Sequence, residues 1–467
     1  NGEQRTYSPE GNIIRRANFV NHLLHGEVLE YHDGPGEKIR EKQKWERGKQ
    51  QGEQLAFHPN GKLARRAVYK DGKPVGAPVD YDDHGKLIKK VEHKHEEEEK
   101  KEEESTEYNS GPEIRKIIPP KLDNCHIGQK IKCYRPVRKG KPMMDVVNDE
   151  KIGKIIANNY GHGGSGWTLA PGAARYVNDL LIDTYHLSGE TPIIIIGAGV
   201  IGLFTAYDLT TRGFHNIKIV ADRFDDLTSH KAGGQVAIAS MSNSLDEEKR
   251  INQIGIATYR FYDQIIQGAL PDIKEGVKKL STYFESKEES GLEPYVSADV
   301  MKPAKDVVLD FGNGTTRQMV SYDDGIFIDT GQMMSNLTDY LKSRRVPLIQ
   351  QKVESFSDVK ERYIINCTGL GAKELNHDDA MVSVQGHLIM LRSQEPSNLQ
   401  YMLVATSPCK RTRHGEEFYI FPKHLLHSNP EDIGVIGGTF IEGATDETPN
   451  EEQFEYIIQN AREFYGL

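Results

Sequence analysis

Three glycines that directly follow a run of isoleucines form the clearest chemical motif in this chain. The sequence TPIIIIGAGVIG contains Gly197, Gly199 and Gly202 at the spacing G-x-G-x-x-G. In such a motif the first glycine permits a tight turn, the second lets the backbone approach a diphosphate, and the third lets a helix pack closely on the preceding strand. The N–H groups at the start of that helix, near Val200 and Ile201, attract the anion. The motif therefore predicts a site for the diphosphate of a dinucleotide.

A carboxylate stands where such a site needs one. A second apolar run, IKIVA (residues 217–221), is followed by Asp222, 25 residues after Gly197. An acid at this point hydrogen-bonds the adenosine ribose hydroxyls and disfavours the additional phosphate of NADP. These features together favour a ligand site over a βαβ unit without a ligand, but they do not distinguish NAD from FAD.

The elements that must position these residues belong to an α/β fold. Four consecutive isoleucines, residues 193–196, predict a strand that is buried on both faces of a parallel sheet. A helix is expected after Gly202, followed by a second strand over residues 217–221. The chain has 467 residues, which is too long for one compact core and predicts two or three folding units.

Several segments outside this motif resemble the D-amino acid oxidase family of FAD-dependent oxidoreductases. The resemblance covers roughly residues 120–467. Its cofactor segments, each with the residues expected to bind the cofactor, are Lys218–Phe224 (Asp222 and Arg223), the hydroxyl-rich turn of Thr228 and Ser229, Lys352–Phe356 (Val353) and Ile364–Gly369 (Thr368). Gly437–Phe440 matches a further family block in the sheet domain. The resemblance implies that the cofactor is FAD.

Two more blocks resemble the parts of the family that lie nearest to the reaction. YRPVR, residues 134–138, is similar to the family's F-R-P-V-R segment, and NYGHGGSGWT, residues 159–168, is similar to its flavin-binding N-Y-G-H-G-G-x-G-x-T block. The flavin contacts that this second block implies are Gly163, Gly166, Trp167 and Thr168. Thr168 is expected to hydrogen-bond the pyrimidine edge of the flavin.

The same resemblance implies how a substrate would be held. Arg135 matches the arginine that binds the substrate carboxylate, and a guanidinium can do so bidentately. Tyr419 matches the tyrosine whose hydroxyl also binds that carboxylate, and Gly164 leaves its backbone groups free to approach the substrate amine. His162 is interpreted as structural support, because hydride transfer to a flavin needs no histidine base. Taken alone, Arg135 could equally be an ordinary salt-bridge residue.

The implied activity is an FAD-dependent oxidation of a D-amino acid, which yields a 2-oxo acid, ammonia and hydrogen peroxide. An alternative within the same chemistry is a glycine or sarcosine type amine oxidase. An alternative from another class is a catalytically inactive flavin-binding scaffold. Dehydrogenation through NAD is the weakest alternative, because it leaves residues 159–168 unexplained.

The family segments stand in an unusual order. In the family the YRPVR and NYGHGG blocks follow the sheet domain, but here they precede Gly197. A circular permutation explains this order, and such a rearrangement is tolerated where the old termini are close together. The expected fold is thus an FAD-binding Rossmann-like domain, centred on residues 191–240 and 352–375, with a mixed-sheet substrate domain.

Two departures concern the predicted substrate pocket. The segment Lys231–Ser240 carries small side chains where the family has bulky ones, which predicts a wider pocket. The expected lid, Cys409–Glu417, contains Arg411, Arg413 and His414. These three residues either face an acidic substrate group or belong to a solvated lid.

A repeat precedes the predicted enzyme. Tyr7, Tyr31, Phe57 and Tyr81 recur at spacings of 24, 26 and 24 residues, and each is followed by a glycine four or five positions later. Such a period is typical of β-hairpin arrays, and the pattern resembles MORN-variant repeats. We therefore expect repeats over residues 1–91, a charged linker over 92–113 and the permuted catalytic domain over 114–467. A protein or lipid is the expected partner of the repeats.

The composition of the chain limits its possible partners and cellular compartment. The formal net charge of −10 argues against general affinity for nucleic acid. No run of about 18 apolar residues predicts a transmembrane segment, and the first residues lack the apolar core of a secretory signal. Four cysteines without metal-like spacing fit a reducing cytosol. Delivery of the protein outside its cell and an earlier targeting segment stay open.

Overall fold

The computed structural model describes most of the chain, in two compact units of residues 1–106 and 107–467. Each unit is considered by itself. The described residues are 2–8, 12–20, 23–32, 34, 36–46, 49–70, 73–74, 79–84, 86, 112–238, 245–273, 275–406, 417–424, 429–444 and 450–467. Most of the predicted charged linker, residues 92–111, lies outside them.

The N-terminal unit contains one antiparallel sheet of nine strands. These strands are β1 (Gly2–Tyr7), β2 (Ile13–Val20), β3 (Leu23–Tyr31), β4 (Ile39–Glu46), β5 (Lys49–Gln50), β6 (Gly52–Phe57), β7 (Leu63–Lys70), β8 (Lys73–Pro74) and β9 (Val79–Asp80). Tyr7, Tyr31 and Phe57 each follow an irregularity in the strand pairing, so the repeated aromatic residue occupies the same register position. The predicted array of β-hairpin repeats is confirmed.

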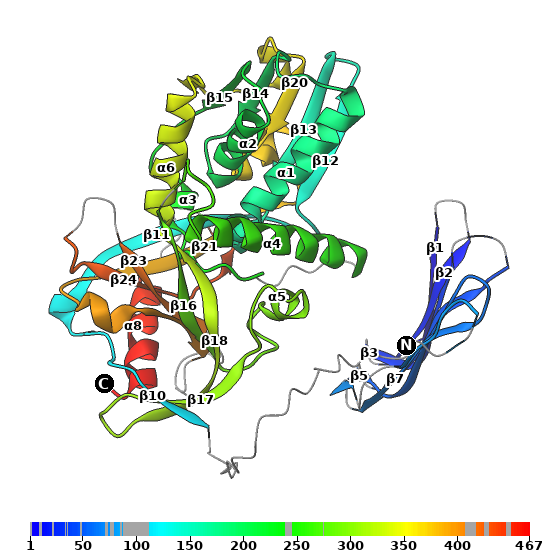
Figure 1. Cartoon of the computed structure of the whole chain (residues 1–467), viewed down its shortest axis with the longest axis horizontal. Coiled ribbons are helices and arrows are strands. Elements are labelled where there is room, and N and C mark those ends of the chain that lie inside the picture. Colours follow the sequence, from blue (N-terminus) through cyan, green and yellow to red (C-terminus); the bar gives the residue numbers. More distant parts are fainter. Residues whose placement is uncertain are drawn as a thin grey trace, which may run out of the picture. The chain divides into compact units, whose positions relative to one another are not determined.

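The smaller sheet of the second unit contains the predicted dinucleotide fold. Its six strands, in spatial order, are β12 (Met143–Asp149), β13 (Lys154–Tyr160), β20 (Tyr363–Asn366), β14 (Ile193–Ile196), β15 (Ile217–Ala221) and β19 (Leu348–Gln350). All neighbours are parallel except β12 and β13. Helices that accompany this sheet are α1 (Gly166–Tyr185), α2 (Val200–Thr211) and α6 (Thr330–Ser343) (Figure 1).

The isoleucine strand β14 is buried on both faces, as predicted. Ile193 and Ile195 join the core formed with helices α1 and α2, whereas Ile194 and Ile196 join a second core on the opposite face. Side chains alternate between the two faces of a strand, so one continuous apolar run fills both cores. Strand β14 therefore fixes the turn that follows it.

The larger sheet has ten strands and carries the predicted substrate side. Along its main path the strands are β10 (Glu113–Lys116), β17 (Lys305–Asp310), β18 (Thr316–Ile328), β16 (Val277–Phe284), β22 (Tyr401–Thr406), β23 (Glu417–His424), β24 (Ile433–Gly437), β21 (Met381–Leu391) and β11 (Ile127–Arg138), and β25 (Ile441–Glu442) pairs with β21. Helix α8 (Glu452–Tyr465) packs into the core of this sheet through Phe454, Ile457 and Phe464. The predicted combination of a Rossmann-like domain with a mixed-sheet domain is confirmed.

The connections of this unit contain the remaining helices. They are η1 (Asn124–His126), η2 (Gly163–Ser165), α3 (Thr228–Lys231), α4 (Leu245–Ile266), α5 (Glu293–Ser297), η3 (Phe356–Asp358), η4 (Gly369–Gly371), α7 (Ala372–Leu375) and η5 (Pro396–Leu399). Helix α4 packs against α1.

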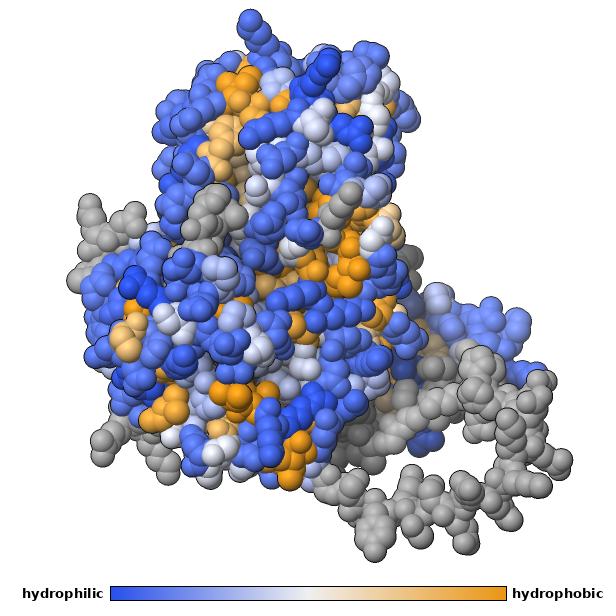
Figure 2. All heavy atoms as spheres, turned by 60° about the vertical axis from the view of Figure 1, so that its left-hand side comes forward, coloured by the Kyte–Doolittle hydropathy of each residue, from blue (hydrophilic) through white to orange (hydrophobic). Residues whose placement is uncertain are grey.

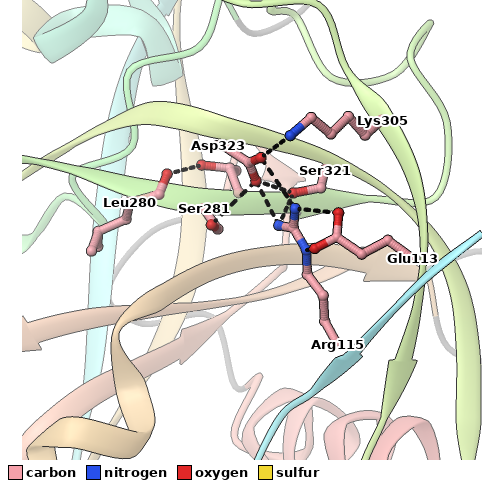
Figure 3. A network of polar contacts seen from close by, with 8 residues as sticks. Glu113, Arg115, Leu280, Ser281, Lys305, Ser321 and Asp323 are labelled. Atoms are coloured by element: carbon pink, nitrogen blue, oxygen red, sulfur yellow. Dashed lines mark hydrogen bonds and ion pairs between the residues drawn. The ribbon is translucent and has the colours of Figure 1, made fainter. Parts of the chain in front are cut away.

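A network of charges attaches the first strand of this unit, β10, to the sheet (Figure 3). Arg115 donates to both carboxylate oxygens of Asp323, at 2.5 and 3.1 Å, and to both oxygens of Glu113, at 2.9 and 3.0 Å. Lys305 and Ser321 also donate to Asp323. These contacts hold the pKa of the Asp323 carboxyl far below its usual range, Arg115 being the largest cause. The network fixes the first strand of the second unit to its larger sheet.

The surface of the second unit is mainly hydrophilic on the face that Figure 2 shows, and its apolar residues gather in separate patches. Within the described residues, no helix is long and apolar enough to cross a membrane. The same residues contain no group of three or more His, Cys, Asp or Glu side chains arranged to hold a metal ion.

Candidate active site

A cavity of ≈ 1410 Å³ brings together segments from both sheets of the second unit. Typical small-molecule sites enclose about 300–1,000 Å³, so this cavity has room for a large cofactor. The predicted residues that line it are Arg135, Gly163, Gly164, Gly166, Trp167, Gly197, Gly199, Val200, Ile201, Asp222, Arg223, Thr228, Ser229, Val353, Thr368 and Tyr419. Gly202 and Thr168 are the two predicted residues that lie outside the lining.

The glycine turn after β14 has the geometry that diphosphate binding requires. Gly197 has a φ of +108°, and a Cβ atom there would lie 2.4 Å from the Cys367 carbonyl oxygen. A Cβ atom on Gly202 would lie 2.0 Å from the Gly197 carbonyl oxygen. Gly202 thus lies beneath the turn, where it lets helix α2 approach, and this explains its absence from the cavity wall. Gly199 precedes the first residue of the helix.

Ser229 forms hydrogen bonds to both glycine-rich segments, residues 159–168 and 197–202. Its hydroxyl accepts a hydrogen bond of 2.9 Å from the Val200 N–H, and its carbonyl accepts one of 3.0 Å from the Trp167 indole. Val200 begins helix α2, and Trp167 lies in the first turn of helix α1. The positive ends of both helix dipoles therefore lie at the cavity, where they favour negative charge.

Four further residues that were predicted to bind the cofactor line the cavity. Asp222 follows the last residue of β15 and is exposed, which leaves its carboxylate accessible for ribose hydroxyls. Arg223 lies beside it, and Val353 comes from the segment after β19. Thr368 donates its hydroxyl to Asn366 at 2.8 Å, at the end of β20. Four predicted cofactor residues from distant parts of the sequence are thus brought together.

Thr168 lies outside the cavity lining, and its predicted contact with the flavin stays a prediction. Its side chain is 1% exposed, and its hydroxyl donates to the Ala237 carbonyl at 2.8 Å and accepts from the Ala237 N–H at 3.3 Å. In this structure the hydroxyl therefore fixes the segment that follows α3, behind the cavity wall. The direction of a side chain on the first turn of a helix depends on what packs against it, which a motif does not specify.

Arg135 and Tyr419, predicted to grip a carboxylate, lie in the same cavity. Arg135 extends from β11 and donates to the Thr439 carbonyl at 2.9 Å. Tyr419, on β23, stacks on Phe421 with ring centroids 4.6 Å apart and an interplanar angle of 11°. Among the described residues no carboxylate pairs with Arg135, so its positive charge is available for a ligand.

Burial shifts the pKa values of two side chains in this cavity. Burial raises the pKa of Tyr419 to about 12, although the Arg135 charge opposes the shift. The phenol is therefore protonated at neutral pH and can donate to a carboxylate. Burial lowers the pKa of His162 to about 4, which keeps its imidazole neutral.

Buried polar groups along the cavity are unsatisfied within the described part of the chain. Both polar atoms of Asn159 have no hydrogen-bond partner there, nor do Nε2 of His162 and Nε2 of Gln235. Buried polar groups are normally hydrogen-bonded, because an unmade bond costs about 1–3 kcal/mol. These groups, together with the glycine turn and the two helix termini, fit a polar aromatic cofactor such as FAD.

Acidic residues line the cavity near Tyr419. Glu417 lies two residues before Tyr419 on β23, and Glu288 and Glu289 also line the cavity. Burial, Glu289 and Glu285 together raise the pKa of Glu417. The hypothesis that Arg411, Arg413 and His414 face an acidic substrate group concerns residues 407–416, which lie outside the described residues.

Sequence reasoning missed several residues of this site. Phe440 lies against Arg135, and Asn159 and Gln235 line the cavity with unsatisfied groups. All three lie in segments already marked by sequence, but no site role was predicted for them. A polar residue at the end of a buried strand, such as Asn159 in β13, is the one signal that could have indicated its role.

Comparisons with known proteins place this site in a family. Residues 192–466 match the family described as FAD dependent oxidoreductase, and residues 1–21 and 50–71 match the MORN repeat variant. A D-amino-acid oxidase of Dictyostelium discoideum is 27% identical over 279 residues, which are 57% of this chain and 71% of the relative.

Two solved structures show a likeness to part of this chain, at low TM-scores. Glycine oxidase from Bacillus cereus ATCC 14579 gives a TM-score of 0.42 at 17% identity, over 58% of this chain and 77% of that chain. Iminodiacetate oxidase from Chelativorans sp. BNC1 gives 0.44 at 15% identity, over 59% and 79%. The family match covers more than half of the chain and includes its glycine turn. The chain therefore belongs to the FAD-dependent oxidoreductase family of the D-amino acid oxidase type, as an amine-oxidising flavoenzyme with MORN-variant repeats at its N-terminus.

Proposed function

We propose that this enzyme oxidises the α-amine of a D-amino acid. The single observation that carries the proposal is the presence of Arg135 and Tyr419 in the same cavity as both glycine segments. A cation without a carboxylate partner among the described residues, next to a protonated phenol, suits a substrate carboxylate. The name of the Dictyostelium discoideum relative supports the choice of D-amino acids.

The side chains would act chiefly by binding and orientation. Arg135 would hold the carboxylate through two parallel N–H donors, and Tyr419 would donate its hydroxyl to the same group. Fixing the carboxylate at two points would restrict how the α-carbon can lie, which is the main contribution that positioning makes to catalysis. The neutral imidazole of His162 is not needed as a base. Gly163 and Gly164 carry no side chains that would block the amine.

The cofactor would be held by the N-terminus of a helix and by neighbouring turns. The start of helix α2 and the Ser229 turn would hold the diphosphate, and Asp222 would hold the ribose. When bound, FAD supplies the acceptor for the hydride of the α-carbon and passes both electrons to oxygen, which becomes hydrogen peroxide. The oxidised amine loses a proton to become an imine, and water converts it to a 2-oxo acid and ammonia.

An anaerobic titration of the purified holoenzyme tests the proposal. D-amino acids, their L-enantiomers, glycine and sarcosine are added in turn, and the flavin band at about 450 nm is recorded. Bleaching by D-amino acids, with recovery on admission of air, is the expected result. Bleaching by glycine or sarcosine alone would show that the enzyme is an amine oxidase of the glycine or sarcosine type. A flavin band that no amine bleaches would favour a catalytically inactive scaffold.

We also infer that the family's segments are circularly permuted in this chain. The family match begins at residue 192, yet β11, β13 and α1 precede that point and contribute residues to the cavity. Helix α1 ends at Tyr185, seven residues before the match begins. A short connection of this kind would join the family's former ends. The test is a set of variants in which residues 114 and 467 are joined by a linker and new termini are placed between residues 186 and 190. We expect these variants to fold and to bind FAD.

A further inference from the structure

Phe440 has an unusual environment for a large apolar residue. Its side chain is 60% exposed, so it contributes little to either core. Instead, its ring lies over the Arg135 guanidinium, with 4.2 Å between Cζ and the ring centroid. The other arginine–ring contacts of the described residues measure 5.1 Å or more. The closest such stack therefore occurs in the active-site cavity, which both residues line.

The backbone of Gly386 also lies close to the guanidinium. A Cβ atom on Gly386 would lie 2.5 Å from Nη1, 2.9 Å from Cζ and 2.9 Å from Nη2 of Arg135. Only a glycine at this position of β21 lets the guanidinium lie where it does. Arg135 is thus confined by the Gly386 backbone and by the Phe440 ring.

The residue before Phe440 holds this arrangement in place. The Thr439 carbonyl accepts from Nη1 of Arg135 at 2.9 Å, and the Thr439 hydroxyl accepts from the His387 N–H at 2.8 Å. Thr439 is itself buried. The dipeptide Thr439–Phe440 therefore holds the guanidinium by a carbonyl and by a ring, and it is anchored to the strand that carries Gly386.

We propose that Phe440 is a positioning residue that clamps Arg135 so that the free N–H edge of the guanidinium faces the substrate carboxylate. The Phe440 ring lies against the guanidinium and leaves its N–H edge for a ligand, and that edge is where carboxylates bind bidentately. The aromatic ring also shields the cation from water while attracting it. This proposal rests on the proposed function, because it takes the ligand of Arg135 to be a carboxylate.

The test uses the full-length holoenzyme and benzoate, a carboxylate that has no amine to oxidise. Its dissociation constant is measured from the change that it causes in the visible flavin spectrum. Phe440→Ala should raise this constant about 10-fold and the KM of the best amino acid similarly, with kcat changed less than about 2-fold. Phe440→Trp should restore tight binding, because it restores a ring over the cation. Phe440→Leu retains apolar bulk without a π-face and should bind benzoate as weakly as Phe440→Ala.

Tyr456→Ala is the matched control. Tyr456 is 38% exposed, and its ring contacts no cation among the described residues, so benzoate affinity should not change. Equal benzoate affinity in Phe440→Ala and the unaltered enzyme would overturn the clamp, and so would wild-type affinity in Phe440→Leu. Because benzoate binding requires no turnover, these results stand even if no amine is oxidised. An unaltered enzyme that binds no benzoate would overturn both the clamp and the carboxylate site, whereas benzoate binding without oxidation would overturn the proposed reaction alone.

Discussion

Two arginines on the opposite edge strands of the larger sheet have contrasting surroundings. Arg115, on β10, is bound by Asp323 and Glu113 and contacts Ser321. Arg135, on β11, donates to one backbone carbonyl and lies under an exposed ring. Among the described residues, the first guanidinium has two carboxylate partners and the second has none.

The different partners of the two arginines indicate different roles, since one contributes to stability and the other is open to a ligand. A cation whose donors are satisfied by protein carboxylates stabilises the fold but has nothing left to offer a ligand. A cation held by a glycine, a carbonyl and a ring gains less for the fold, yet it stays ready for an anion. The two arginines should therefore respond in opposite ways to the same substitution.

The largest effect is expected for Arg135→Ala. Loss of the guanidinium removes a bidentate, charge-assisted contact, which typically costs about 4 kcal/mol or about 1,000-fold in kcat/KM. Oxygen consumption with the best amino acid measures this loss. The midpoint of thermal unfolding should change little, because Arg135 has no carboxylate partner among the described residues and the ring that stacks on it is exposed. A fall in activity of less than about 10-fold would show that the substrate carboxylate binds elsewhere.

Arg115→Ala should show the reverse behaviour. Its removal leaves the partly buried Asp323 without its main partner, and the free energy of unfolding of the catalytic unit should fall by about 2–3 kcal/mol. Denaturation by urea, with FAD in excess, measures the change, while the KM should be unaffected. Lys305→Ala serves as control, since its side chain is 59% exposed and exposed ion pairs contribute about 1 kcal/mol or less. If Arg115→Ala and Lys305→Ala lowered the free energy of unfolding equally, Arg115 would not be the main partner of Asp323.

Tyr419→Phe should weaken carboxylate binding without removing the charge. A hydrogen bond to a charged group contributes about 1.5–3 kcal/mol, so the dissociation constant of benzoate should rise about 10-fold or more. The pKa of Tyr419, raised by burial to about 12, also predicts that benzoate affinity in the unaltered enzyme is constant from about pH 6 to 10. A loss of benzoate affinity near pH 9 in the unaltered enzyme, but not in Tyr419→Phe, would contradict this prediction. It would show that the pKa of Tyr419 is lower than stated.

The smallest effect concerns the pH dependence of the Arg115 network. The folded-state pKa of Asp323 lies below its unfolded value, which is about 3.9. Its contribution to stability is thus fully present above that value and is lost as pH falls through the folded pKa. Asp323→Asn should reduce the free energy of unfolding by about 1–2 kcal/mol at pH 7, and the difference should shrink below about pH 4. Urea denaturation at pH 7, 5 and 3 measures it, and a difference that is unchanged at pH 3 would contradict the ionic origin.

The sequence was most informative where chemistry depends on the local backbone. The turn at Gly197 and the close approach of helix α2 at Gly202 follow from glycine itself, because a Cβ atom would collide with a neighbouring carbonyl at either position. Strand β14 was predictable for a related reason, since four apolar residues in succession must fill two cores. Such features need little knowledge of the rest of the chain.

Contacts between distant segments could not be predicted in this way. Arg135 and Thr439 are 304 residues apart, and Arg115 and Asp323 are 208 residues apart. No period or spacing indicates that Phe440 stacks on Arg135 or that the Thr168 hydroxyl binds Ala237. These contacts depend on strand order and on side-chain direction, which are settled only when the sheets assemble.

The central position of β20 also determines when the enzyme can be completed during its synthesis. Strands β13 and β14 flank β20 in the smaller sheet, and the buried pair Asn158 and Asn366 is separated by 208 residues. The ribosome makes both flanking strands long before their shared neighbour, so their inner edges wait unpaired while more than a third of the chain is added. Exposed strand edges are open to misassembly during such an interval. Productive folding of the FAD site is consequently a late event, reached only after the strand that ends at Asn366 has left the ribosome.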